Sequence, residues 1–183
     1  MKKLILFDID KTLIKSSTGH EASFSRGFKE VYGVESKISI INHHGMTDQQ
    51  IIIEALKKKG LDEAEIMLKM EECMKIMIDY FNQIKDTIQI DVLKGVPELL
   101  SELDKRNNIL GLVTGNLEPI GRGKLEKAGL NQYFKLGAFG NDDIDRTKLV
   151  KLSIKRAEEN FDFKINRNVF LFGDSPKDIV AGN

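Results

Sequence analysis

Residues 4 to 13 of the chain read Leu-Ile-Leu-Phe-Asp-Ile-Asp-Lys-Thr-Leu. Four apolar residues without a polar break, followed abruptly by Asp8 and Asp10, are typical of a strand buried on both faces of a parallel sheet. Ligands of such sheets bind at the carboxyl ends of the strands. Two carboxylates two residues apart on an extended segment point the same way, and a divalent cation relieves their repulsion. The stretch therefore predicts a Mg2+ site whose other partner is a phosphate group, unless Asp10 only caps a helix.

The composition indicates what kind of protein this is and which partners it does not favour. Of 183 residues, 41% are hydrophobic and 31% are charged, which is ordinary for a soluble globular protein. Lysine plus arginine equals aspartate plus glutamate at 28 each, so bulk charge favours neither nucleic acid nor an anionic membrane as a partner. No apolar run is long enough for a signal peptide or a membrane span. The lone Cys73 excludes an internal disulfide and fits a reducing compartment, so we expect a cytoplasmic protein.

Residues from about 20 to 83 have the apolar spacing of helices, and no strand signal interrupts them. Gly33 closes the first helix, and Thr47 and Gln50 are spaced as the capping box of the next. A further single helix capped by Asp62 carries one apolar stripe: Ile66, Met70, Cys73, Met77 and Phe81. Because methionine fills irregular gaps, we assign four methionines to the packed interior of this block: Met67, Met70, Met74 and Met77.

The pattern changes after about residue 84. Helical segments then alternate with three buried apolar runs: 109–113, 134–138 and 169–172. This alternation predicts an α/β fold with a parallel, doubly wound, Rossmann-like sheet.

The position of the all-helical block divides the chain. Because it follows the first strand, we expect a core domain of residues 1–15 and 91–183 with an inserted helical cap domain of residues 16–90.

The three clearest strands end in residues that phosphoryl transfer requires. Asp8 and Asp10 follow the first strand, and Thr114 follows the second. Asp174 follows the last, with Asp178 four residues further on. Because parallel strands end at one edge of a sheet, we expect these groups to converge although they are far apart in the sequence.

Three motifs resemble those of the haloacid dehalogenase-like hydrolases. Residues 8–13, Asp-Ile-Asp-Lys-Thr-Leu, resemble motif I, with Lys11 where Gly or Asn is common; we expect this departure to alter loop shape rather than chemistry. Residues 113–116, Val-Thr-Gly-Asn, are similar to motif II, and residues 173–178, Gly-Asp-Ser-Pro-Lys-Asp, to motif IV. The matches occur in the family's order and span nearly the whole chain, so the chain is identified as a member.

The resemblance implies roles for the acidic residues. Asp8 is similar to the nucleophile that forms an aspartyl-phosphate, and Asp10 to the general acid that later acts as general base. A carboxylate oxygen of Asp8, the backbone carbonyl of Asp10 and Asp174 would hold Mg2+, with Asp178 binding it through water or orienting its ligands.

The phosphoryl oxygens need hydrogen-bond donors and a fixed positive charge. The resemblance assigns the donors to the hydroxyl of Thr114 and the backbone N–H of Gly115. The positive charge, motif III of the family, is Arg146 or Lys148. We favour Arg146, because its Asp-Arg-x-x-Leu context is similar to a branch of the family in which Arg replaces Lys.

The cap resembles the helical C1-type caps of the phosphoglycolate-phosphatase-like branch through residues 45–48, Gly-Met-Thr-Asp. His43 and His44 precede this segment, and we expect them to be surface residues rather than ligands. For His20 we favour a polar role at a helix start over one in the site.

These observations favour a cytoplasmic Mg2+-dependent phosphatase that hydrolyses a small phosphomonoester, with no nucleic-acid or membrane partner. Asp10 argues against dehalogenase chemistry, because dehalogenases lack the second aspartate of motif I. Two alternatives stay open: a phosphosugar mutase, which would use the same residues, and a non-catalytic phospho-accepting signalling module. The sequence indicates neither the particular ester nor the oligomeric state.

The last residue, Asn183, falls within the helix after motif IV, whereas family members continue through a further edge strand. We therefore expect a core truncated at its C-terminal edge. Such a truncation would leave the expected site residues in place and would expose the edge and apolar face of the 169–172 strand.

Overall fold

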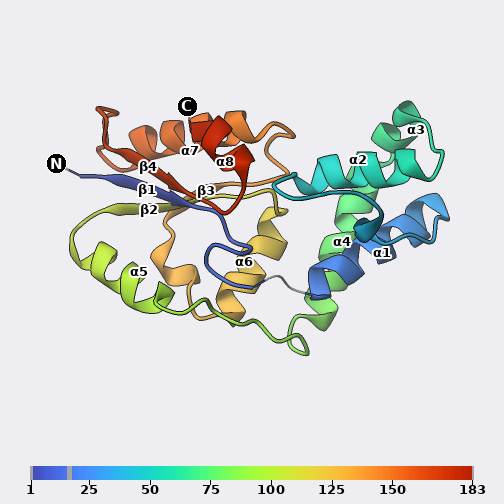
Figure 1. Ribbon diagram of the computed structural model, residues 1–183, viewed down its shortest axis with the longest axis horizontal. Coiled ribbons are helices and arrows are strands. Elements are labelled where there is room, and N and C mark those ends of the chain that lie inside the picture. The colour runs from blue at the N-terminus through green and yellow to red at the C-terminus, as the bar shows by residue number, and fades with distance from the viewer. Residues whose placement is uncertain (1, 16–17, 183) are drawn as a thin grey trace.

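Four parallel strands form one sheet with helices on both of its faces (Figure 1). The computed structural model describes residues 2–15 and 18–182. The strands are β1 (Leu4–Phe7), β2 (Ile109–Val113), β3 (Leu136–Ala138) and β4 (Val169–Phe172). Their order across the sheet is β3-β2-β1-β4, and each neighbouring pair is parallel. The predicted α/β fold with a Rossmann-like parallel sheet is confirmed.

Two helical layers cover the sheet. Their helices are α5 (Val96–Lys105), α6 (Glu118–Lys127), α7 (Arg146–Asn160) and α8 (Pro176–Gly182), with a short helix η2 (Asn131–Tyr133). Ile5 and Phe7 of β1 belong to the apolar cluster that includes side chains of α5 and α6. Leu4 and Leu6 belong to the cluster that includes side chains of α7 and α8. Successive strand residues point to opposite faces, so an unbroken apolar run fills both layers.

A separate group of helices lies beyond the carboxyl ends of the strands (Figure 1). It comprises α1 (Thr18–Tyr32), η1 (Ile38–Ile40), α2 (Asp48–Lys58), α3 (Glu63–Leu68) and α4 (Met70–Ile84). Phe24, Phe28 and Phe81 lie in its own apolar cluster, which Ile120 of α6 and the preceding Leu117 also join. Within residues 18–84 as described, no strand interrupts the helices. We propose that this group is the cap domain; residues 16 and 17, at its expected start, lie outside the described residues.

Local signals placed two helix ends correctly. Gly33 follows α1 with φ +68°, the left-handed conformation that glycine adopts without steric cost. Thr47 caps α2: its side chain accepts the N–H of Gln50, and the Gln50 side chain accepts the N–H of Thr47. In the described part of the chain, no helix is long and apolar enough to cross a membrane.

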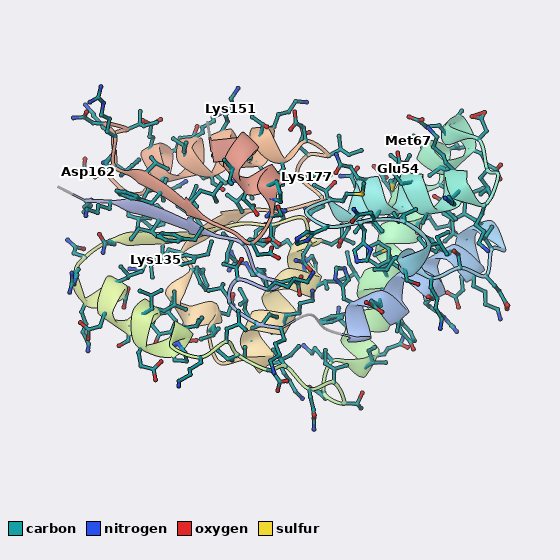
Figure 2. All side chains as sticks on the ribbon, viewed as in Figure 1. Glu54, Met67, Lys135, Lys151, Asp162 and Lys177 are labelled. Atoms are coloured by element: carbon teal, nitrogen blue, oxygen red, sulfur yellow. The ribbon has the colours of Figure 1, made fainter. Side chains whose placement is uncertain are left out.

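The expectation of one helix from Asp62 to the end of the cap is wrong, because the helix is interrupted at Lys69. Lys69 has φ −110° and ψ 9°, which ends α3 and starts α4. The five residues of the predicted apolar stripe are all buried nevertheless. Met67 does not belong to the packed interior, since it is 49% exposed and projects from α3 (Figure 2).

β4 lies at an edge of the sheet, next to β1. Its burial alternates, and Phe170 and Phe172 are 41% and 48% exposed. The expected exposure of this strand's edge and apolar face is therefore observed among the described residues. Asn183, with which the sequence ends, lies outside them.

Candidate active site

Asp8 and Asp10 lie where β1 ends and the chain turns. The Asp8 side chain is buried, and its Oδ1 accepts the backbone N–H of Ile9 at 2.8 Å. Lys11 has φ +61°, in the left-handed region that few residues other than Gly and Asn adopt readily. Lys11 thus occupies a turn whose backbone suits the residues that motif I usually carries there.

Three carboxylates meet beside the end of β1 and form the candidate metal site. Asp8, Asp174 and Asp178 each offer one oxygen, and these oxygens lie within 4.8 Å of one another. Asp178 Oδ2 accepts hydrogen bonds from the N–H and the hydroxyl of Ser175, at 3.0 and 2.8 Å. Asp178 Oδ1 is buried, and the guanidinium of Arg146, 2.7 Å away, forms an ion pair with it without the alignment of a hydrogen bond. Clustered acidic oxygens with a free lone pair fit a hard cation such as Mg2+.

Arg146 places a positive charge against two of these acids. Its Nη2 lies 2.8 Å from Asp8 Oδ2 and 2.7 Å from Asp178 Oδ1, and the side chain is buried. Lys148 instead pairs with Asp143 at 3.2 Å on the surface. Residues two apart on a helix point in widely different directions, so only one of the two expected cations faces the acids. The structure thus places Lys148 away from the acids, and the assignment of the phosphate-binding cation to Arg146 stays a prediction.

Burial controls the ionisation of Asp8. Desolvation raises its pKa above the usual aspartate value; Arg146 opposes this, while Asp178 and Asp10 reinforce it. For Arg146, burial works against the charge, but Asp8 and Asp178 outweigh it and raise the pKa. The positive charge of Arg146 is thus permanent, whereas ionising Asp8 costs free energy that a bound cation would offset.

Thr114 and Gly115 follow β2 and lie at the same edge of the sheet. The Thr114 hydroxyl is buried and accepts the side-chain amide of Asn116 at 2.7 Å. A Cβ added at Gly115 would lie 2.3 Å from the backbone oxygen of Met46, so only glycine fits under this cap loop. The structure therefore brings both expected phosphate-binding residues beside the acids.

The carboxylate of Asp10 is not part of the three-acid group and pairs with Lys124 instead. Lys124 Nζ lies 2.9 and 2.7 Å from the two Asp10 oxygens, and Asn116 donates to Asp10 Oδ2 at 2.9 Å. Burial opposes ionisation of Asp10, but the charge of Lys124 and the hydrogen bonds from Lys124 and Asn116 hold its pKa below the usual range. The expected metal ligand at this position, the Asp10 backbone carbonyl, stays a prediction.

His20 and Asp48 extend this network into the cap. Lys124 Nζ lies 3.0 Å from His20 Nδ1, and His20 Nε2 lies 2.9 Å from Asp48 Oδ2. The preference for a helix-start role of His20 outside the site is wrong, because its ring lies between two buried charged groups.

The acids open into a cavity of about 280 Å3 between the sheet edge and the cap helices. Asp8, Asp10 and Asp174 line it from the core, and His43 and His44 from the loop before α2. His44 Nε2 lies 3.6 Å from Asp174 Oδ2. His44 is exposed and His43 is partly buried, so both reach the surface as expected, and both also line the cavity.

Comparison with known families identifies the chain. The haloacid dehalogenase-like hydrolases match residues 5–183. The chain belongs to this family. It is accordingly an enzyme of the hydrolase class, with a site consistent with hydrolysis of phosphoric monoesters.

Relatives of this haloacid dehalogenase-like hydrolase cover most of its length. The pyrophosphatase PpaX of Oceanobacillus iheyensis is 26% identical over 180 residues, which are 98% of this chain and 78% of the relative. The solved structure of CbbY from Rhodobacter sphaeroides in complex with phosphate has a TM-score of 0.73 and 17% identity, covering 100% of this chain and 84% of that one. A putative phosphoglycolate phosphatase from Lactobacillus plantarum has a TM-score of 0.68 and 18% identity, covering 99% and 82%. At these identities the solved structures show the shared fold.

Sequence reasoning missed Lys124, Asn116 and Asp48 in this hydrolase. Lys124 is 1% exposed and lies four residues after the buried Ile120 on α6. A lysine on the buried face of a helix requires an acidic or polar partner, and that was an available signal. The sequence did not indicate which residues are the partners of Lys124, because Asp10 and His20 are distant from it in the sequence.

The raised pKa of Asp8 makes the stability of the metal-free protein depend on pH. Asp8→Asn should stabilise the protein relative to the parent, and the difference should grow as pH rises from about 4, where an unfolded aspartate ionises. Above the folded pKa the difference should level off, because the parent then carries the buried charge fully. Thermal unfolding in a chelator between pH 4 and 8 would measure this; a difference that is constant or shrinks with pH would contradict it.

Proposed function

We propose that the chain is a Mg2+-dependent phosphatase that hydrolyses a small phosphomonoester through an aspartyl-phosphate on Asp8. The observation that carries the proposal is the convergence of Asp8, Asp174 and Asp178 with Arg146. Asp8, Asp174 and Arg146 also line one cavity. Asp178 Oδ1, which is buried and has no aligned hydrogen-bond donor in the described chain besides its ion pair with Arg146, supports a cation among these acids. A bound Mg2+ would neutralise charge between the aspartate nucleophile and an anionic phosphate.

In the first step, a carboxylate oxygen of Asp8 attacks phosphorus, and the bond from phosphorus to the ester oxygen breaks. Asp10 donates a proton to the departing oxygen, so the alcohol leaves neutral. Arg146, the Thr114 hydroxyl and the Gly115 N–H would bind the phosphoryl oxygens. Lys124 favours the ionised form of Asp10, and the negative charge of an arriving phosphate raises its pKa again and favours proton uptake.

In the second step, water attacks the acyl phosphate and Asp10 takes its proton. Inorganic phosphate leaves and the Asp8 carboxylate is regenerated. The low pKa that Lys124 maintains suits Asp10 to this role, because an ionised carboxylate is the form that accepts a proton.

The cavity supports a small substrate. A volume of about 280 Å3 lies just below the range of roughly 300–1,000 Å3 that is usual for small-molecule sites. Among the similar structures, one CbbY complex holds xylulose-(1,5)bisphosphate, and PpaX is named a pyrophosphatase. We propose a phosphorylated metabolite of this size class as substrate and, with one buried cysteine, the cytoplasm as compartment.

A phosphosugar mutase would use the same acids, so the product decides between the two activities. A screen of phosphate esters with Mg2+ should release inorganic phosphate from at least one of them. Conversion of a sugar phosphate to its isomer without phosphate release would instead identify a mutase.

The metal assignment predicts a selective loss of Mg2+ binding. Asp174→Ala should weaken binding about tenfold or more, because it removes one of three acidic oxygens at the site. Asp143→Ala is the matched control, since Asp143 pairs with Lys148 outside the cavity. Titration calorimetry with Mg2+ measures both variants. Equal binding by Asp174→Ala and the parent, or full activity in a chelator, would refute the metal assignment.

A further inference from the structure

A chain of buried polar contacts runs from the cap to the proposed acid and base. The ammonium of Lys124 has three N–H donors, and its acceptors are the Asp10 carboxylate, Asn116 Oδ1 at 2.7 Å and His20 Nδ1 at 3.0 Å. Each donor is used, and the side chain is almost fully buried. The loss of any acceptor would therefore leave a buried ammonium N–H without a partner, which is costly.

These contacts indicate which ring nitrogen of His20 accepts a hydrogen bond and which donates one. Because an ammonium only donates, His20 Nδ1 must accept, and the ring proton belongs on Nε2. Nε2–H then donates to Asp48 Oδ2 at 2.9 Å. Asp48 is itself held in place: its Oδ2 accepts the N–H of Leu117 at 2.9 Å, and its own N–H donates to the carbonyl of Gly115 at 2.8 Å.

We propose that His20, oriented by Asp48, is a positioning residue that sets Lys124 and through it the carboxylate of Asp10. The proposal rests on the proposed function, because it assigns the acid and base roles to Asp10. His20 lies on α1 and Asp48 on α2, so two helices of the proposed cap contribute to the alignment of a side chain of the core. Docking of these helices thereby completes the acid–base machinery as well as closing the cavity.

Other hydrogen bonds link the proposed cap to the core without involving Lys124. Gln49 Nε2 donates to the carbonyl of Gly140 at 2.6 Å, and the Thr47 hydroxyl donates to that of Ile144 at 3.1 Å. Gln49 is not among the residues that line the cavity. Gln49→Ala therefore removes one docking contact and spares the Asp10 network, which makes it the matched control.

The test compares two probes, p-nitrophenyl phosphate and glycerol 3-phosphate, on His20→Phe. The phenyl ring keeps the bulk next to Phe24 and removes both hydrogen bonds. We expect glycerol 3-phosphate turnover to fall about a hundredfold, because an alkoxide needs a proton from Asp10 to leave. Formation of the acyl phosphate from p-nitrophenyl phosphate should fall much less, and the acyl phosphate on Asp8 should accumulate. His20→Asn, whose Oδ1 can still accept from Lys124, should recover part of the loss and serves if His20→Phe does not fold.

A double-mutant comparison separates positioning from a general structural role. Once Asp10→Asn has removed the acid and base, adding His20→Phe should change the rate of acyl phosphate formation less than about threefold. Multiplicative losses, or an equal leaving-group effect in Gln49→Ala, would overturn the proposal. If the parent itself forms no acyl phosphate on Asp8, the proposed function fails. If the parent forms it and His20→Phe processes both probes like the parent, the positioning role alone fails.

Discussion

Replacing Asp8 by asparagine should abolish covalent labelling by substrate and lower turnover by about 10⁴-fold or more. An amide is a poor nucleophile, and no other carboxylate is expected to take over the attack. Asp10, the nearest acid in the sequence, is paired on both oxygens with Lys124. The loss should be the same for p-nitrophenyl phosphate and for an alkyl phosphate, since both need the nucleophile. Mass spectrometry of rapidly quenched protein measures the label, and phosphate release measures the turnover.

Asp10→Asn is the comparison variant, because it separates loss of the acid and base from loss of the nucleophile. It should leave Asp8, Asp174 and Asp178 in place and remove the acid and base. The first step should then be impaired less with p-nitrophenyl phosphate, whose leaving group needs little protonation, than with an alkyl phosphate. Because dephosphorylation still needs the base, the acyl phosphate on Asp8 should accumulate. A label on Asp10 or Asp174, or equal damage to both substrates in the first step, would refute the assigned roles.

Arg146→Ala should have the second large effect, on both catalysis and stability. Without the guanidinium, Asp8 and Asp178 remain buried, and no other cation in the described part of the chain lies within ion-pair distance of them. This costs about 3–5 kcal/mol of the free energy of unfolding. Loss of a charge at the phosphoryl oxygens should lower kcat/KM by about 10²–10³-fold. Added Mg2+ should restore part of the stability, because the cation supplies positive charge to the same acids.

Lys148→Ala is the control for Arg146, being two residues away on the same helix. Its exposed ion pair with Asp143 is worth at most about 1 kcal/mol, and we expect nearly parental activity. Urea unfolding with and without Mg2+, together with steady-state kinetics, measures both variants. A larger loss of kcat/KM in Lys148→Ala than in Arg146→Ala would reverse the assignment of the phosphate-binding cation.

Local apolar patterns predicted the sheet well. The runs at 109–113 and 169–172 became β2 and β4 with the expected bounds, because an unbroken apolar run is typical of a strand in a parallel sheet. This holds even for β4, which is only partly buried at the edge of the sheet. The weaker run at 134–138 shortened to Leu136–Ala138, since the turn of η2 reaches to Phe134. In the cap, the burial of the apolar stripe was predictable, but the break at Lys69 was not, as nothing in that stretch is a strong helix breaker.

The sequence by itself determined that Asp8, Asp10, Thr114, Asp174 and Asp178 follow strands, and a parallel sheet brings strand ends together. Only the tertiary structure decided which cation faces the acids, because the orientation of α7 against the sheet turns Arg146 inward and leaves Lys148 in solvent. Only the tertiary structure also revealed the contacts among His20, Asp48 and Lys124. These residues are 28 to 104 positions apart along the chain and meet only where α1 and α2 dock beside α6. No local periodicity encodes such a contact, since it depends on the relative placement of whole helices rather than on the conformation of any one of them.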